Sequence, residues 1–301
     1  MPRIVVAHSD RKAQRTLQRM VGAAARSVDV VGDAGALAEA VDADTIAVVD
    51  VALARAHADL RARAARAWIA VPGEGNAPAD TASVDALLAA GWTHVVAHAM
   101  PILAEELLAT VQKLLRRDVF GLEKYVVWGA TVKTYALANT GDRDDVVAAL
   151  AKDVVALGLP HRVASLVSVA ADELVANALY AAPIDERGAR FRTSEPRDKR
   201  RALAGRDEVT VRLATDARYL AIEVRDRWGS IDTGAIAPRL AAKAQSEGGM
   251  GLPLVYACCN QLVVACAPNT ATETIALVDV RYKPTELGRS ASFHVFTGEI
   301  T

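Results

Sequence analysis

Strand-like and helix-like segments alternate over the first 115 residues. Short runs rich in Val, Ile and Ala alternate with longer amphipathic stretches; the runs are 4–7, 28–31, 45–49, 68–71 and 94–97, and the stretches are 11–25, 53–65, 83–90 and 102–115. This pattern predicts an α/β fold in which helices cover both faces of a parallel sheet. The run at 28–31 is the weakest of the five.

The composition excludes several classes of protein. With 301 residues the chain is long enough for two domains, and a net charge of -1 gives no general attraction to nucleic acid or to a membrane surface. No apolar run reaches the roughly 18 residues that a membrane-spanning helix needs, and no signal-like segment begins the chain. We therefore expect a cytoplasmic protein.

The three cysteines lack metal-binding spacing, so we expect them to be reduced residues that pack in the interior.

Three motifs in the second half carry the chemistry. Glu173 and Asn177 are four residues apart, which places a carboxylate and an amide on one face of a helix. Asp226 ends an apolar strand-like run, where a carboxylate can accept a hydrogen bond from an exocyclic amine. The glycines 248, 249 and 251 precede an apolar helical stretch, so that backbone amides can approach phosphates at a helix N-terminus.

In this order the motifs resemble those of the GHKL ATPases, which include histidine-kinase catalytic domains and the anti-sigma-factor serine kinases. The resemblance covers residues 131–301 and implies a two-layer α/β sandwich that binds ATP and Mg²⁺. It implies that Glu173 is the catalytic base and Asn177 the magnesium ligand, and that the ATP-binding residues are Asn177, Asp226, Gly229, Gly249, Met250, Gly251, Leu252 and Thr272.

Two departures from the family pattern bear on activity. Trp228 stands where the first glycine box has its first glycine, so the local backbone there must differ from that of the family. Its indole ring either fills a gap in the core or stacks on a base. Asn177 is followed by Ala178, Leu179, Tyr180 and Ala181, without the basic residue or histidine found in sensor kinases. Phosphoryl transfer is therefore a weaker expectation than nucleotide binding.

The first half resembles a response-regulator receiver domain. Asp50 ends the third strong strand-like run, where that family has its phospho-accepting aspartate. His8 and Ser9 stand in place of the acidic pair that binds magnesium, and Met100 replaces the lysine before Pro101. A phosphate on Asp50 would have little to offset its charge. We interpret residues 1–117 as a pseudo-receiver with a flavodoxin-like fold. The same pattern of strands and helices also fits flavodoxin-like folds outside the receiver family.

Two further segments have a predicted role. Residues 118–130 join the halves, and the aromatic residues Phe120, Tyr125 and Trp128 predict a packed connector. Residues 184–207 form an insert with eight basic side chains, whose ordinary interpretation is a solvated loop and whose alternative is a clamp on phosphates or an acidic partner. Residues 232–247, between the two glycine boxes, are the candidate ATP lid.

His94 and His98 flank one strand and are interpreted as ordinary core or surface histidines.

The resemblance as a whole implies a cytoplasmic bacterial signalling protein that binds ATP and Mg²⁺. One hypothesis is a serine/threonine kinase of an anti-sigma partner-switching system, whose partner is an anti-sigma antagonist, a sigma factor or another regulator. The alternative is a non-catalytic nucleotide-binding adaptor or scaffold that acts through protein–protein contacts. Under either hypothesis, a second copy of this chain is a further candidate partner, in a homodimer. Nucleic-acid binding has only the basic insert behind it, and the near-neutral chain argues against it.

Overall fold

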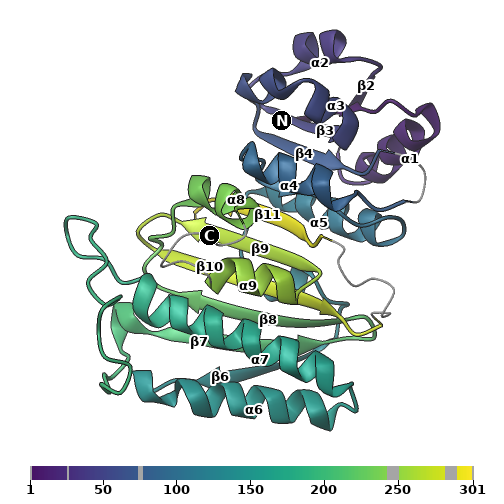
Figure 1. Cartoon of the computed structure of the whole chain (residues 1–301). Coiled ribbons are helices and arrows are strands. Elements are labelled where there is room, and N and C mark those ends of the chain that lie inside the picture. The colour runs from purple at the N-terminus through teal and green to yellow at the C-terminus, as the bar shows by residue number, and fades with distance from the viewer. Residues whose placement is uncertain (1, 26, 74–76, 243–250, 282–289, 300–301) are drawn as a thin grey trace. The chain divides into compact units, whose positions relative to one another are not determined.

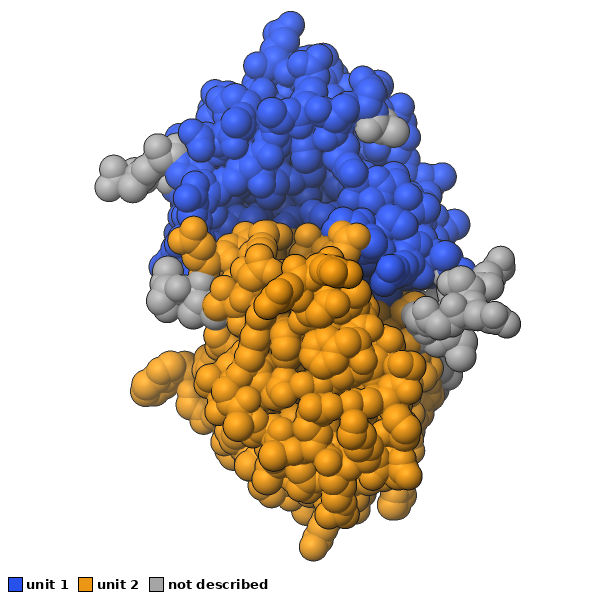
Figure 2. All heavy atoms as spheres, turned by 90° about the vertical axis from the view of Figure 1, so that its left-hand side faces the viewer, with its two compact units in different colours: residues 1–118, 234–242, 288–294 blue, residues 119–233, 243–287, 295–301 orange. Residues whose placement is uncertain are grey.

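The computed structural model describes residues 2–25, 27–73, 77–242, 251–281 and 290–299. The chain has a mixed α/β fold and divides into two compact units. Unit 1 comprises residues 1–118, 234–242 and 288–294, and unit 2 comprises residues 119–233, 243–287 and 295–301 (Figure 2). Each unit therefore contains segments that are distant in sequence.

Figure 1 labels most of the regular elements, and its colours follow the chain from the N-terminus to the C-terminus. The strands are β1 Arg3–Ala7, β2 Val28–Val31, β3 Thr45–Asp50, β4 Ala67–Val71, β5 His94–Val95, β6 Thr131–Ala136, β7 Val209–Thr215, β8 Tyr219–Asp226, β9 Gln261–Ala267, β10 Ala271–Asp279 and β11 Ser292–Thr297. The α-helices are α1 Arg11–Gly22, α2 Ala34–Ala40, α3 Val51–Ala56, α4 Thr81–Ala89, α5 Ile102–Arg116, α6 Arg143–Ala156, α7 His161–Ala176, α8 Thr233–Ala241 and α9 Gly251–Cys258.

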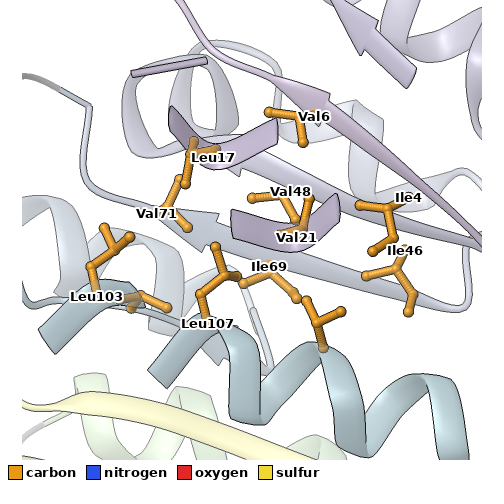
Figure 3. Packing of buried hydrophobic residues seen from close by; sticks show 12 residues of the cluster. Ile4, Val6, Leu17, Val21, Ile46, Val48, Ile69, Val71, Leu103 and Leu107 are labelled. Carbon is orange, nitrogen blue, oxygen red and sulfur yellow. The ribbon is translucent and has the colours of Figure 1, made fainter. Parts of the chain in front are cut away.

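Unit 1 is built on the parallel strands β1 to β5, in the order β2-β1-β3-β4-β5. Helices α1 and α5 cover one face, where Leu17, Val21 and Leu107 pack on alternate strand residues such as Ile46 and Ile69 (Figure 3). The intervening strand residues are also buried and point the other way, toward α2, α3 and α4. The parallel sheet expected from the alternating pattern is confirmed.

Aspartate side chains fix the starts of four helices in unit 1. Asp10, Asp33, Asp50 and Asp80 each accept a backbone N–H from the first turn of the helix that follows. Such caps satisfy donors that an isolated helix leaves unpaired, and each contributes about 1 kcal/mol.

The start of β11 completes the polar interior of unit 1. Phe293 and His294 pair antiparallel with β5, and Ser292 Oγ accepts the backbone N–H of Ala97 at 2.8 Å. The buried carboxylate of Glu106 on α5 lies 2.6 Å from His294 Nε2 and 3.0 Å from His98 Nδ1. Burial acts to raise the pKa of Glu106, but the hydrogen bonds with His294 and His98 lower it to about 2.

Unit 2 is built on an antiparallel sheet in the order β9-β10-β8-β7-β6. Helices α6, α7 and α9 lie together on one face of this sheet (Figure 1). The helical stretch His161–Ala181 has the length and hydropathy of a membrane span, but 56% of its apolar window is buried within the protein. It comprises α7 and its continuation, and it serves unit 2 as a core helix.

The connector differs in part from its prediction. Phe120 and Leu122 are buried, and the backbone N–H of Gly121 donates to both carboxylate oxygens of Glu273 on β10. Trp128 is fully exposed, with a relative accessibility of 102%, and Val127 is 63% exposed. The prediction of a packed connector is therefore right for residues 120–122 and wrong for Trp128. No described residue packs over that indole ring.

Candidate functional site

The end of α7 places Glu173 and Asn177 next to each other. The helix changes at Asn177 from α-helical to a turn of π-helix, Asn177–Ala181, and the Asn177 N–H donates to the carbonyls of Glu173 and Leu174. Such π-helical turns are rare and recur at functional sites. Arg143 at the start of α6 forms a bidentate ion pair with Asp172, at 2.7 and 2.6 Å, which holds the helix beside Glu173 in place.

Gly251 at the start of α9 approaches both of these side chains. A Cβ atom on Gly251 would lie 2.7 Å from Glu173 Oε2 and 3.2 Å from Asn177 Nδ2. Both distances are shorter than ordinary contacts, so a side chain at residue 251 would push the Glu173 carboxylate or the Asn177 amide out of its present position. Asn177 Nδ2 is also buried and lacks a hydrogen-bond partner in the structure. The first and third predicted motifs therefore meet in one place.

Asp226 at the end of β8 is paired with Thr272 on β10. The two residues are directly opposite in the antiparallel register, and both side chains are buried. Asp226 Oδ1 accepts the backbone N–H groups of Trp228, at 2.8 Å, and Gly229, at 3.3 Å. Burial raises the pKa of Asp226, and these two hydrogen bonds oppose the rise. The prediction that Asp226 ends a strand is confirmed.

Gly229 is required by the backbone that surrounds it. It has a φ of +57°, and a Cβ atom would lie 2.1 Å from the carbonyl oxygen of Ala267 and 2.7 Å from the N of Thr270. Its own carbonyl accepts the N–H of Asn269 at 3.1 Å. Gly229 therefore locks the loop after β8 against the turn between β9 and β10, which fixes the position of Asp226 and Thr272.

A hydrogen bond connects the loop after β8 with the chain that follows Asn177. Ser230 Oγ donates to the carbonyl of Ala182 at 2.5 Å. Helix α7 also packs on β8 and β10. The two groups of predicted residues, Glu173 with Asn177 and Asp226 with Thr272, thus belong to one framework of helix, strand ends and loop.

Most of the basic insert is exposed, as its interpretation as a solvated loop predicts, but part of it packs against this framework. Arg192 is buried and forms an ion pair with Asp207 at 2.6 Å. Phe191 meets the buried Trp228 edge to face, with 6.1 Å between ring centroids, and Arg206 lies 4.4 Å above the same indole. Nothing in the composition of the insert indicates this packing, because the aromatic partner lies far away in sequence.

Some predicted residues lie outside the described part of the chain. These are Gly249 and Met250, the neighbouring Gly248, and residues 243–247 of the candidate lid. The rest of the lid segment contains α8, and residues 234–242 of this segment belong to unit 1. Leu252 is the second residue of α9 and is half-buried.

Asp50 in unit 1 is an interior capping residue. It is fully buried, and its Oδ1 accepts the N–H of Leu53 at 2.7 Å while its Oδ2 accepts the N–H of Ser9 at 2.6 Å. His8 Nδ1 accepts the N–H of Asp10, so that Nε2 carries the proton and donates to the carbonyl of Pro72. Both oxygens of Asp50 are therefore engaged by the backbone.

The residues available for a metal ion limit what the site can hold. Among the described residues no group of three or more His, Cys, Asp or Glu side chains is arranged to hold a metal. Magnesium needs no such group, because it commonly binds through one or two side chains, waters and the phosphates of a nucleotide. Asn177, with the unpartnered end of its amide beside Gly251, fits that requirement.

No family model matches this chain, and no curated protein matches it either. The geometry of the site is therefore the basis for the function proposed below.

Proposed function

We propose that unit 2 is a GHKL-type domain that binds ATP with Mg²⁺. The observation that carries the proposal is the approach of Gly251 to Glu173 and Asn177, so close that a side chain at residue 251 would displace the Glu173 carboxylate. A carboxylate, an amide and a helix N-terminus in one place suit the triphosphate end of a nucleotide. The antiparallel sheet with three helices on one face supports the two-layer sandwich of that family.

Each residue then has a role. Asp226 and Thr272 hold the adenine ring, Asn177 is the protein ligand of Mg²⁺, and the second glycine box, Gly249 to Leu252, receives the phosphates. When bound, the metal ion would neutralise charge on the phosphate oxygens. In a kinase, Glu173 accepts the proton of a partner's Ser or Thr hydroxyl while that oxygen bonds to the γ-phosphorus and the bond to ADP breaks.

Unit 1 supports a signalling role. Its parallel strand order, 2-1-3-4-5, is that of flavodoxin-like folds, and the full engagement of Asp50 supports a receiver-like module that has lost phosphoryl acceptance. We propose a cytoplasmic signalling protein in which the degenerate receiver contacts a regulatory partner. The specific observation that favours the non-catalytic adaptor is the side chain of Trp228, buried under the insert where the family has glycine.

Titration of the full chain with ATP, ADP and AMP in the presence of Mg²⁺ tests the proposal. Binding at a hundredfold excess over Kd should stabilise the protein by about 2.7 kcal/mol in denaturant unfolding. Asp226→Asn should lower the affinity for all three adenine nucleotides, because the amide can present its NH₂ group where the adenine needs an acceptor. The amide oxygen can still accept the backbone N–H groups of the loop, so the loop should keep its structure. Asp198→Asn, an exposed change in the insert, is the matched control. No binding of any nucleotide by the wild-type protein at millimolar concentration contradicts the proposal.

A further inference from the structure

The insert, residues 184–207, contains cations that the protein does not neutralise. Three of its eight basic side chains form ion pairs: Arg192 with Asp207, and both Lys199 and Arg201 with Glu195. The other five form no ion pair within the described part of the chain; they are Arg187, Arg190, Arg197, Arg200 and Arg206. Unpaired guanidinium groups on a packed segment are candidates for binding an anion.

Arg197 differs from the other unpaired arginines in its support and its place. Its guanidinium carbon lies 3.7 Å from the centroid of the Tyr180 ring, the shortest such distance between a cation and an aromatic ring in the described residues. Tyr180 itself is buried and belongs to the π-helical turn that begins at Asn177, three residues earlier. Tyr180 and Asn177 therefore belong to one π-helical turn, and Arg197 stacks on a ring of that turn.

Stacking on a ring leaves the guanidinium able to bind an anion. The five N–H donors of arginine lie in the plane of the group, so a ring against one face occupies none of them. Arg197 is exposed on its other side. The ring also restricts the rotamers of the side chain, which lowers the entropy lost when the donors engage an oxyanion.

The insert is anchored well enough to hold Arg197 in this position. Leu203 N donates to the Ala138 carbonyl at 2.9 Å, and Thr140 N donates to the Arg201 carbonyl at 2.9 Å, which ties the insert to the segment before α6. Ion pairs of Glu195 with Lys199 and Arg201 brace the segment around Arg197. Arg197 is thus presented by a braced loop.

We propose that Arg197, held on the face of Tyr180, binds the β- and γ-phosphates of the nucleotide and so determines the preference for triphosphate over monophosphate. The assignment rests on the nucleotide site proposed for unit 2. It gives the basic insert a function in that site. Residues 178–181, which follow Asn177, contain no basic side chain, and Arg197 of the insert would supply the positive charge instead.

The test measures the affinities of ATP, ADP and AMP, each with Mg²⁺, for full-length Arg197→Met and Arg197→Lys. Methionine retains an apolar chain over Tyr180 and removes the donors, and lysine retains the charge. We expect Arg197→Met to weaken ATP by about tenfold or more and AMP by less than about twofold, as loss of one charged hydrogen bond predicts. Arg197→Lys should recover part of the loss. Arg187→Met, an exposed arginine of the same insert that stacks on no aromatic ring among the described residues, should change neither affinity.

The outcomes separate this proposal from the one on which it rests. If the wild-type protein binds no nucleotide, both fail. If it binds ATP and Arg197→Met binds ATP equally well, the role of Arg197 is overturned and the nucleotide site stands. An equal loss for ATP, ADP and AMP also overturns it, because a side chain that only supports Tyr180 would affect all three alike. Unfolding midpoints of each variant show whether the fold has been kept.

Discussion

Gly251 lies so close to Glu173 that a Cβ atom at residue 251 would be 2.7 Å from the Glu173 carboxylate. The contact joins residues 78 positions apart in the sequence and brings a helix N-terminus to a carboxylate that is only half-buried. A negative side chain beside a helix N-terminus is favourable by a few tenths to 1 kcal/mol. Any substitution at residue 251 must displace the carboxylate, the helix or both.

Gly251→Ala should therefore impair the site more than the fold. The Glu173 side chain can rotate away toward solvent, so we expect a loss of stability below about 1 kcal/mol, together with a clear loss of nucleotide affinity. Calorimetric titration with ATP and chemical denaturation measure the two effects. Gly22→Ala, at the end of α1 where a Cβ would meet nothing within 4 Å, is the control and should alter neither property adversely. Unchanged ATP affinity in Gly251→Ala would contradict the placement of phosphates at this helix end.

Glu173→Gln separates an enzyme from an adaptor. Glutamine has nearly the same shape and keeps one carbonyl oxygen, so nucleotide affinity should stay close to that of the wild-type protein. Loss of a general base typically lowers a rate by 10²–10⁴-fold, or roughly 3 to 5 kcal/mol of barrier. Phosphate release and transfer of labelled phosphate to a partner protein are the measurements. If the wild-type protein binds ATP but turns over no faster than Glu173→Gln, the adaptor alternative stands.

Gly229→Ala should destabilise the protein severely. A residue other than glycine at a φ of +57° costs about 1 to 2 kcal/mol, and the Cβ would in addition lie 2.1 Å from a backbone oxygen that no rotamer can move. Gly205→Ala isolates the first effect, because Gly205 has a φ of +60° and a Cβ there would meet nothing within 4 Å. Urea unfolding of the two variants should show a much larger loss for residue 229. Equal losses would show that the β9–β10 turn yields easily.

Asp50 should resist phosphorylation by acetyl phosphate. Its oxygens accept hydrogen bonds from Leu53 and Ser9, and the neighbouring His8 provides no carboxylate for magnesium. Intact-mass measurement after incubation should show no stable gain of a phosphate. Asp50→Ala should cost at least about 1 to 2 kcal/mol of stability, since it removes a helix cap and leaves interior N–H groups unpaired. A stable adduct that disappears in Asp50→Ala would refute the interpretation of unit 1 as a pseudo-receiver.

Buried His94 and Glu106 of unit 1 should make stability fall with acid in two stages. Burial, together with nearby His294 and Lys113, lowers the pKa of His94 in the folded protein well below 6.5. As the pH falls, His94 therefore takes up a proton in the unfolded chain before it does so in the folded protein. The free energy of unfolding should decrease as the pH drops below about 6.5. The pKa of Glu106 is lowered from 4.5 to about 2, so its contribution is complete above 4.5 and is lost as pH falls toward 2. Urea unfolding between pH 8 and 3 measures both stages. His94→Gln should flatten the first stage, and exposed His161→Gln should not.

The sequence predicts the local features of this fold well and its distant contacts poorly. Short apolar runs locate the strands of residues 1–117, and amphipathic stretches locate the helices there except α2, which the pattern does not predict. The apolar run 219–224 correctly places Asp226 at a strand end. The packing of Phe191 and Arg206 on Trp228 depends on side chains that meet across intervening elements, and no period or motif encodes such a meeting. The pairing of Glu106 with His294, 188 positions apart, is hidden for the same reason. The exposure of Trp128 runs against the usual burial of large aromatic residues.

The contribution of β11 to unit 1 has a consequence for synthesis of the chain. Ser292 and His294 supply hydrogen bonds to Ala97 and Glu106, so the interior of the first unit cannot be completed until the ribosome has translated residue 294. At roughly 5 to 20 residues per second, about ten seconds or more separate the emergence of Glu106 from that of its partner. During that interval Glu106 has His98 but not His294 as a partner, and the edge of β5 that β11 later covers stays unpaired.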